Sequence, residues 1–104
     1  MSNPRVEVLK NILSAKPEDS FARYGLAMEH VKAGEFDLAA AEFKTLISHN
    51  PDYCYAYFHG AQSLEKLGRK EDAREMYRAG IEAAGRTGDA HARSELQAAL
   101  DLLG

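Results

Sequence analysis

The chain has 104 residues and a formal net charge of −3 at pH 7, and 45% of its residues are hydrophobic. This length provides for one small domain and excludes two independent cores of ordinary size, while the hydrophobic fraction excludes a disordered chain. Alanine and leucine are the two commonest residue types, whereas valine, isoleucine and threonine are scarce, so the composition favours helices and excludes a β-sandwich or β-barrel.

The first half of the chain predicts three helices, and the first of them covers residues 4–15. The second covers residues 19–33, where small and apolar residues recur every three or four positions, and Gly34 ends it because glycine tolerates a left-handed cap. The third runs from about residue 37 to residue 48 and stops before Pro51, since the residue before a proline is pushed out of helical space. Its expected buried residues are Leu38, Ala39, Phe43, Leu46 and Ile47.

The second half predicts three more helices. Two of them cover residues 53–67 and 71–84, and residues 85–88 are expected to form a loop in place of a proline stop. The last helix covers residues 89–103. Its ending echoes residues 64–68, and we expect a one-residue insertion in the loop before it.

A 34-residue period relates the two halves of the chain. Small residues, an aromatic residue and turn residues all recur at this spacing. The matched pairs are Pro17 and Pro51, Ala27 and Ala61, Gly34 and Gly68, Ala39 and Ala73, and Phe43 and Tyr77. Such a period is typical of a helical repeat, in which stacked units share one core. The four alanines are expected to mark the points where helices cross closely.

This period and residue pattern resemble the tetratricopeptide repeat (TPR) family, whose pattern is a bulky residue, Leu-Gly, Tyr, Ala, Phe and Pro at fixed spacings. The first unit supplies Arg23, Leu26, Ala27, His30, Ala39, Phe43 and Pro51. The second unit supplies Tyr57, Gly60, Ala61, Leu64, Ala73 and Tyr77. The departures from the family pattern are Arg23 for the bulky aromatic residue, His30 for tyrosine, Gly60 for leucine and Gly85 for the second proline.

The resemblance implies an all-α fold, a superhelix of helix-turn-helix units with about six helices. A single unit cannot bury its apolar face, so the flanking helices are expected to complete the core. In this interpretation residues 1–104 form one domain. Its parts are the N-terminal helix at 4–15, the first repeat at 19–51, the second repeat at 53–84 and a C-terminal capping helix at 89–103.

The residue types used in catalysis and metal binding form no recognisable constellation. The four histidines, at positions 30, 49, 59 and 91, make no His-x3-His or His-Glu-x2-His pair, and one cysteine cannot make a zinc knuckle. Cys54 and His59 are five positions apart on one helix, which turns them about 140° away from each other. We therefore expect no catalytic residue, no metal site and no cofactor, and a protein that is not an enzyme.

The resemblance also implies which residues face a groove, because the first helix of each TPR unit lines the concave surface. The candidate peptide-binding residues are Phe21, Tyr24, Met28, Tyr55, Phe58, His59 and Gln62. Some TPR domains hold a partner's C-terminal carboxylate with Lys and Asn, but Tyr24, Met28 and His59 occupy such positions here, so this clamp is absent. Two interpretations of the aromatic residues stay open: packing against the flanking helices, or an exposed patch that binds a peptide or helix.

These features predict a non-enzymatic protein-interaction module that binds an apolar or amphipathic peptide or helix in its concave groove. One alternative is a scaffold that forms a homodimer through the same face. Another is a single-stranded RNA binder that stacks bases on Tyr24, Tyr55 and Phe58, although the acidic balance opposes nucleic-acid binding. A lone cysteine, no signal pattern and no long apolar run lead us to expect a cytoplasmic chain with a protein or peptide partner and without a membrane partner.

Overall fold

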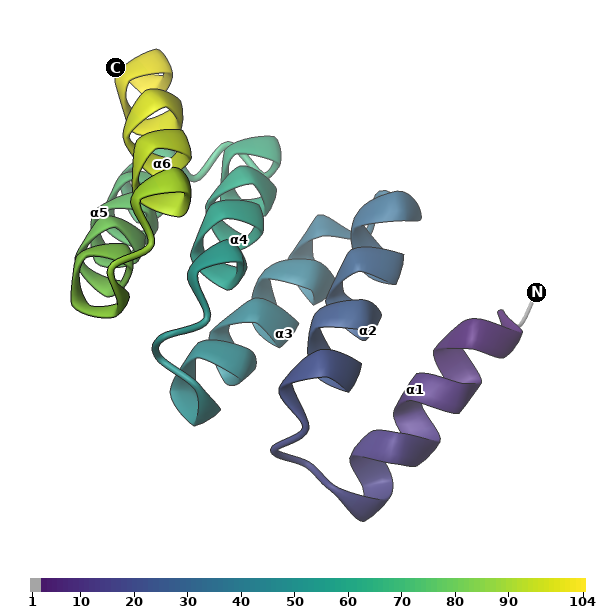
Figure 1. The fold of residues 1–104 in the computed structure, drawn as a ribbon. Helices are drawn as coiled ribbons and strands as arrows, with labels where there is room; N and C mark the ends of the chain where they lie inside the picture. The colour runs from purple at the N-terminus through teal and green to yellow at the C-terminus, as the bar shows by residue number, and fades with distance from the viewer. Residues whose placement is uncertain (1–2) are drawn as a thin grey trace.

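The computed structural model describes residues 3–104, and these residues form six α-helices and no strand (Figure 1). The helices are α1 (Pro4–Ala15), α2 (Ser20–Lys32), α3 (Phe36–His49), α4 (Cys54–Lys66), α5 (Lys70–Thr87) and α6 (Ala90–Leu103). The first two residues of the chain lie outside the described part. The prediction of an all-α fold with about six helices is confirmed.

Caps and turns follow the residues that the sequence places between the helices. The carboxylates of Asp19 and Asp89 each accept a hydrogen bond from the backbone N–H three residues later, at 2.9 Å in both cases, which satisfies a donor in the first turn of α2 and of α6. Gly34 and Gly68 turn the chain after α2 and α4, and both have φ of 76°. Only glycine enters this left-handed region without a Cβ clash. The two turns, 34 residues apart, therefore share the same backbone conformation as well as the same residue.

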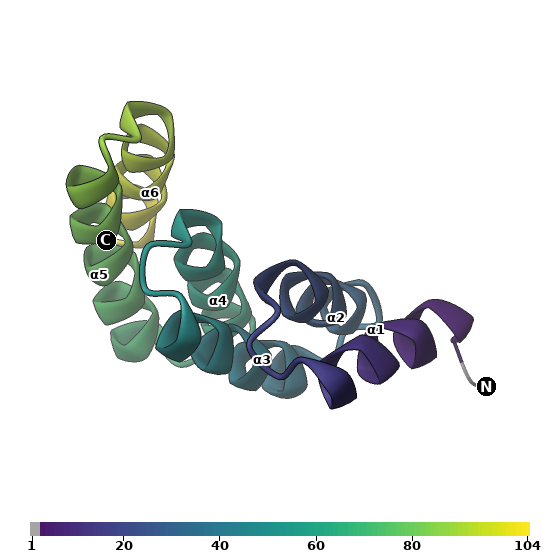
Figure 2. The same cartoon turned by 60° about the horizontal axis from the view of Figure 1, so that its bottom comes forward.

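The helices form a curved double layer. In Figure 2, α2, α4 and α6 lie on the inner side of the curve, and α1, α3 and α5 lie on its outer side. Each helix packs mainly against its neighbours in the sequence, with an additional contact between α4 and α6. Within the described part of the chain, no helix is both long enough and apolar enough to cross a membrane.

Alanine occupies the points where the helices cross. The four periodic alanines are fully buried, with 0% of each side chain exposed, as the period predicts. They are Ala27, Ala39, Ala61 and Ala73. The rings of Phe43 and Tyr77, which are also 0% exposed, fill the space between neighbouring units. The core therefore has small alanine side chains where helices cross and large aromatic rings between the crossings. A larger side chain at a crossing would push two helices apart.

Leu38 does not lie in this core, so its predicted burial is wrong. Its side chain is 46% exposed, whereas Ala40, two residues later, is 4% exposed. Helix α3 packs on α2 through Ala39 and Phe43 and on α4 through Ala40. Leu38 falls outside both of these faces because each residue turns a helix by about 100°, which places Leu38 on the far side of Ala39 from Ala40.

The predicted loop at residues 85–88 is also wrong. Helix α5 continues to Thr87 and ends at Gly88, which has φ of 73°. The first unit stops α3 at His49 because Pro51 follows, but no proline follows α5. The helix therefore gains a further turn and ends on a left-handed glycine instead.

This further turn changes the spacing of the last helix. Tyr53 directly precedes α4 and is the position that the 34-residue period pairs with Asp19, which directly precedes α2. Asp89 precedes α6 in the same way, but the period pairs Tyr53 with Thr87, two positions earlier. The insertion therefore has two residues, and the prediction of one residue is wrong.

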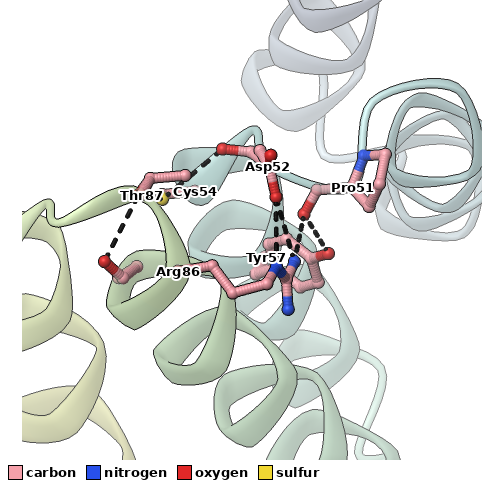
Figure 3. A network of polar contacts seen from close by, with 7 residues as sticks. Pro51, Asp52, Cys54, Tyr57, Arg86 and Thr87 are labelled. Atoms are coloured by element: carbon pink, nitrogen blue, oxygen red, sulfur yellow. Dashed lines mark hydrogen bonds and ion pairs between the residues drawn. The ribbon is translucent and has the colours of Figure 1, made fainter.

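A polar network holds the end of α5 against the loop that leads into α4 (Figure 3). The Arg86 guanidinium donates to Oδ1 of Asp52 from Nε at 3.2 Å and from Nη2 at 3.1 Å, and to the Pro51 carbonyl at 3.3 Å. The Tyr57 hydroxyl donates to the same carbonyl at 2.5 Å. The buried Cys54 thiol lies 3.6 Å from the Asp52 carbonyl oxygen. These groups are thus engaged within the fold, at the shared end of α4 and α5.

Candidate functional site

Aromatic side chains meet between α2 and α4, the first two helices of the inner layer. Tyr24 on α2 and Phe58 and His59 on α4 are half-buried. The His59 ring centroid lies 6.0 Å from that of Tyr24 and 5.2 Å from that of Phe58. Phe43 lies behind them, 6.2 Å from His59, and Tyr53 lies 5.2 Å from Tyr24. We refer to these five residues as the aromatic cluster; its edge-on and tilted ring pairs add stability beyond the area that they bury.

A cavity of about 510 Å³ opens beside the aromatic cluster. Its lining residues are Val31, Phe36, His59, Gln62, Ser63, Glu65 and Lys66. Val31 and Phe36 are partly buried and apolar, whereas Gln62 and Lys66 are exposed. The lining is therefore mixed: two apolar side chains face five polar or charged ones, so the cavity can contact both apolar and hydrogen-bonding groups of a ligand.

The titratable groups of the aromatic cluster are neutral at physiological pH. Burial lowers the pKa of His59 and outweighs both its hydrogen bond with Gln62 and the charge of Glu95, which raise it. Burial raises the pKa of Tyr24 and of Tyr53. The cluster therefore presents uncharged rings with hydroxyl and imidazole groups, which suits an apolar ligand that also offers hydrogen-bonding groups.

Tyr55 connects this site to α6. Its hydroxyl donates to Oε1 of Glu95 at 3.1 Å, and the same oxygen lies 2.5 Å from Nε2 of His91. The Tyr55 ring lies 6.4 Å from that of Phe58. Burial, together with the hydrogen bond and the charge of Glu95, raises the pKa of Tyr55, so its hydroxyl stays protonated and donates.

The predicted groove residues do not all meet at one place. Tyr24, Phe58 and His59 belong to the aromatic cluster, and Gln62 lines the cavity beside it. Phe21 is 83% exposed, and its ring makes no aromatic pair within residues 3–104. The two other predicted residues are Met28, half-buried against Ala27 and Phe43, and Tyr55, described above.

Several residues of the site are absent from the predicted set, among them Tyr53, Phe36 and Glu95. Tyr53 aligns with Asp19 at the 34-residue spacing, and that alignment indicates a helix cap and gives no sign of a groove residue. Phe36 is the first residue of α3, which is the outer helix of its unit. Glu95 aligns with the predicted groove residue His59 when the insertion before α6 has two residues. The one-residue insertion assumed from the sequence hides this match.

The residue types most often used in catalysis and metal binding make small local contacts. Within residues 3–104, no three His, Cys, Asp or Glu side chains lie close enough together to hold a metal ion. The polar neighbours of Cys54 are the Asp52 carbonyl and the Thr87 hydroxyl, the latter at 3.7 Å. His30, which replaces a tyrosine of the repeat pattern, pairs with Glu35 at 2.9 Å.

The family of the chain is decided by a match to a known family model. The model of the tetratricopeptide repeat matches residues 24–89, which run from α2 through α5 to the residue that precedes α6. The chain belongs to the tetratricopeptide repeat family. The TPR resemblance inferred from the 34-residue period is therefore confirmed.

Several solved structures share this architecture. The NMR structure of a tetratricopeptide repeat domain protein from Salinibacter ruber is 41% identical, with a TM-score of 0.79, over 85% of this chain and 89% of that one. A Bordetella parapertussis protein is 25% identical, with a TM-score of 0.82, over 99% and 89% of the two chains. The TPR2B domain of yeast Sti1, in a complex with pHsp70, has a TM-score of 0.87 over 94% and 78% of the two chains, and at 18% identity it shows the fold alone. No curated protein matches this chain.

Proposed function

We propose that this TPR chain is a protein-interaction module that binds an apolar or amphipathic segment of a partner protein along the aromatic cluster. The observation that carries the proposal is the partial exposure of Tyr24, Phe58 and His59 beside a cavity of about 510 Å³. Rings at such a position bury a large area on binding and lose little conformational freedom. The neutral state of these groups suits contact with the apolar side chains of a partner.

Two structural neighbours support a binding role for the scaffold. The yeast Sti1 domain is in a complex with pHsp70. The Yersinia enterocolitica protein SycD is a type III secretion translocator chaperone, 17% identical, with a TM-score of 0.86 over 94% of this chain and 68% of its own. These properties belong to those proteins. They favour a protein partner as the class of ligand for this chain.

The test blocks the cavity without touching the core. Gln62 is exposed at the cavity, so the substitution Gln62→Arg places a long cation across it, next to Lys66, and leaves the aromatic cluster in place. The probe is a set of dodecapeptides selected by phage display on the immobilised wild-type chain. We expect the selected peptides to carry apolar residues three or four positions apart, and to bind Gln62→Arg about tenfold or more weakly by fluorescence anisotropy.

The matched control introduces the same side chain on the outer layer. Leu38 is 46% exposed on α3, so Leu38→Arg should leave the affinity unchanged. Circular dichroism checks that both variants keep the helicity of the wild type. Peptides that bind Gln62→Arg as tightly as the wild type would show that they occupy another surface, and the proposal would then be wrong.

A further inference from the structure

Helix α6 repeats α2 at the residues that position it. Four residues at the start and in the first half of each helix are identical at a spacing of 70: Asp19 and Asp89, Ala22 and Ala92, Arg23 and Arg93, and Leu26 and Leu96. Both aspartates cap their helix in the same way, and Ala22, Ala92, Leu26 and Leu96 are all buried. Helix α6 therefore presents the faces of an inner TPR helix in the register of the first unit.

In the first unit, α3 covers one of these faces. Nη1 of Arg23 pairs with Oε1 of Glu42 on α3 at 2.6 Å, and the two side chains are only 15% and 24% exposed. One turn further along α2, Ala27 packs against Ala39 and Phe43 of α3. Two contacts thus fix how the outer helix lies on this face of α2: the ion pair between Arg23 and Glu42, and the close packing of the two helices at Ala27.

On α6 the same face forms an open groove of about 640 Å³. Its lining residues on α6 include Arg93, Ser94, Gln97 and Asp101, and the end of α5 contributes Ala84 and Gly85. Arg93 is exposed, and no carboxylate within residues 3–104 forms an ion pair with it. Gln97 stands where α2 has Ala27, and its amide donates to Asp101 at 3.0 Å. The groove therefore has Arg93 in the position of Arg23, but within the described part of the chain it has no counterpart of Glu42.

We propose that this groove is a second docking surface, which binds an amphipathic helix of a partner protein with a glutamate facing Arg93. The incoming helix takes the place on α6 that α3 has on α2, with its apolar side toward the end of α5. Because Gln97 is larger than Ala27, the incoming helix lies further from α6 than α3 lies from α2. A small residue of the incoming helix faces Gln97. This surface is separate from the aromatic cluster, and it goes beyond the function proposed above.

A second copy of this chain fits the groove less well. Helix α1 has exposed Val8 and Ile12, which are 57% and 39% exposed, so it is the helix of another copy that would most readily dock. At the 34-residue spacing, however, Val8 corresponds to Glu42, and Arg5 corresponds to Ala39. Helix α1 would therefore leave Arg93 without an acid and place a cation at the crossing. The charge pattern favours a different protein as the partner.

The chain itself supplies the probe for this groove. A labelled peptide of residues 35–50 carries Glu42 and Phe43 in the α3 register, and a lactam bridge between Asp37 and Ala41→Lys, two exposed positions, keeps it helical. We expect this peptide to bind the full chain, and Arg93→Glu to weaken binding about tenfold because an attractive pair becomes repulsive. The Glu42→Arg peptide should then bind Arg93→Glu about as well as the original pair binds.

A second variant keeps the proposal testable if the wild-type affinity is low. Gln97→Ala restores the small residue of the first unit at an exposed position, so we expect it to tighten peptide binding several-fold. Amide shifts should map the peptide to Ser94 and Ala98, with the aromatic cluster unchanged. The proposal is overturned if neither chain binds the peptide, or if charge reversal at Arg93 has no effect. A homodimer that Arg93→Glu dissociates, seen by light scattering, would also overturn it by naming a second copy as the occupant.

Discussion

At the scale of single residues, His59 is the group whose charge the fold controls. Its ring lies among Tyr24, Phe43 and Phe58, and the charge of Glu95 on α6 acts on it. Burial lowers its pKa below the ordinary value of about 6.5, so the unfolded chain binds more protons than the folded chain between the two values. The free energy of unfolding therefore falls as the pH drops through this window.

The substitution His59→Gln removes this dependence, because glutamine does not titrate. We expect the wild type to lose stability relative to His59→Gln when the pH is lowered from 7.5 to 5.0, measured as urea midpoints at each pH. The control is His49→Gln, which makes the same substitution at an exposed position at the end of α3. Parallel profiles for the wild type and His59→Gln would contradict the burial of the imidazole.

The residues of the site were predictable only in part. The repeat register indicated Tyr24, Phe58 and His59 as groove residues, and the structure brings these three together because one face of α2 meets one face of α4. Phe21 has the same assigned role but lies in the first turn of α2 and is 83% exposed. Tyr53 lies outside any helix, so helical periodicity could not indicate its contact with Tyr24. Register finds residues on helix faces and misses those that loops contribute.

At the scale of the helices, two glycines permit the closest approaches. A Cβ atom added at Gly80 of α5 would lie 2.6 Å from Cβ of Tyr57 and 3.0 Å from Leu96. A Cβ atom at Gly60 of α4 would lie 2.6 Å from Sδ of Met76, the flexible end of its side chain. We therefore expect Gly80→Ala to destabilise by about 1–3 kcal/mol and Gly60→Ala by less, because Met76 can move away.

Gly85 supplies the control for this pair. It lies in the same helix as Gly80, is exposed, and an added Cβ atom would meet nothing within 4 Å. Gly85→Ala should stabilise by about 0.5–1 kcal/mol, since alanine has the higher helix propensity. Thermal melting of the three variants measures the order, and destabilisation by Gly60→Ala equal to that by Gly80→Ala would show that the α3–α4–α5 contact is as rigid as the α4–α5–α6 contact.

The ends of the helices show where sequence reasoning stops. The proline after α3 predicts its end correctly, because a proline acts on the residue before it whatever the surroundings. The glycines near residue 85 predict a loop, yet α5 passes through Gly85 and ends at Gly88. Arg86 in that further turn donates a hydrogen bond to Asp52, which lies just before α4. The two residues are 34 positions apart in the chain, with the whole of α4 between them. A contact between such distant parts of the chain is tertiary, so local propensity could not reveal it.

At the scale of the molecule, the stacking of neighbours decides how the chain unfolds. Each helix packs mainly on the helices next to it in the sequence, and α1 packs on α2 through Leu9 and Leu13. The centre is different, because α4 contacts α3, α5 and α6. In a stacked array, the free energy of unfolding is close to a sum of contributions from each unit and each interface. An end helix can therefore unfold locally while the central helices stay folded.

Two leucine substitutions test this in amide exchange. Leu9 is 8% exposed at the α1–α2 contact, and Leu64 is 1% exposed on α4. We expect Leu9→Ala to speed exchange in α1 and leave α4 and α5 almost unchanged, because the lost contacts belong to one interface. Leu64→Ala should speed exchange throughout by lowering the global free energy of unfolding by about 2–5 kcal/mol. If Leu9→Ala instead reduces protection equally in all helices, α1 opens only when the whole array unfolds, and the sum of interfaces does not describe this molecule.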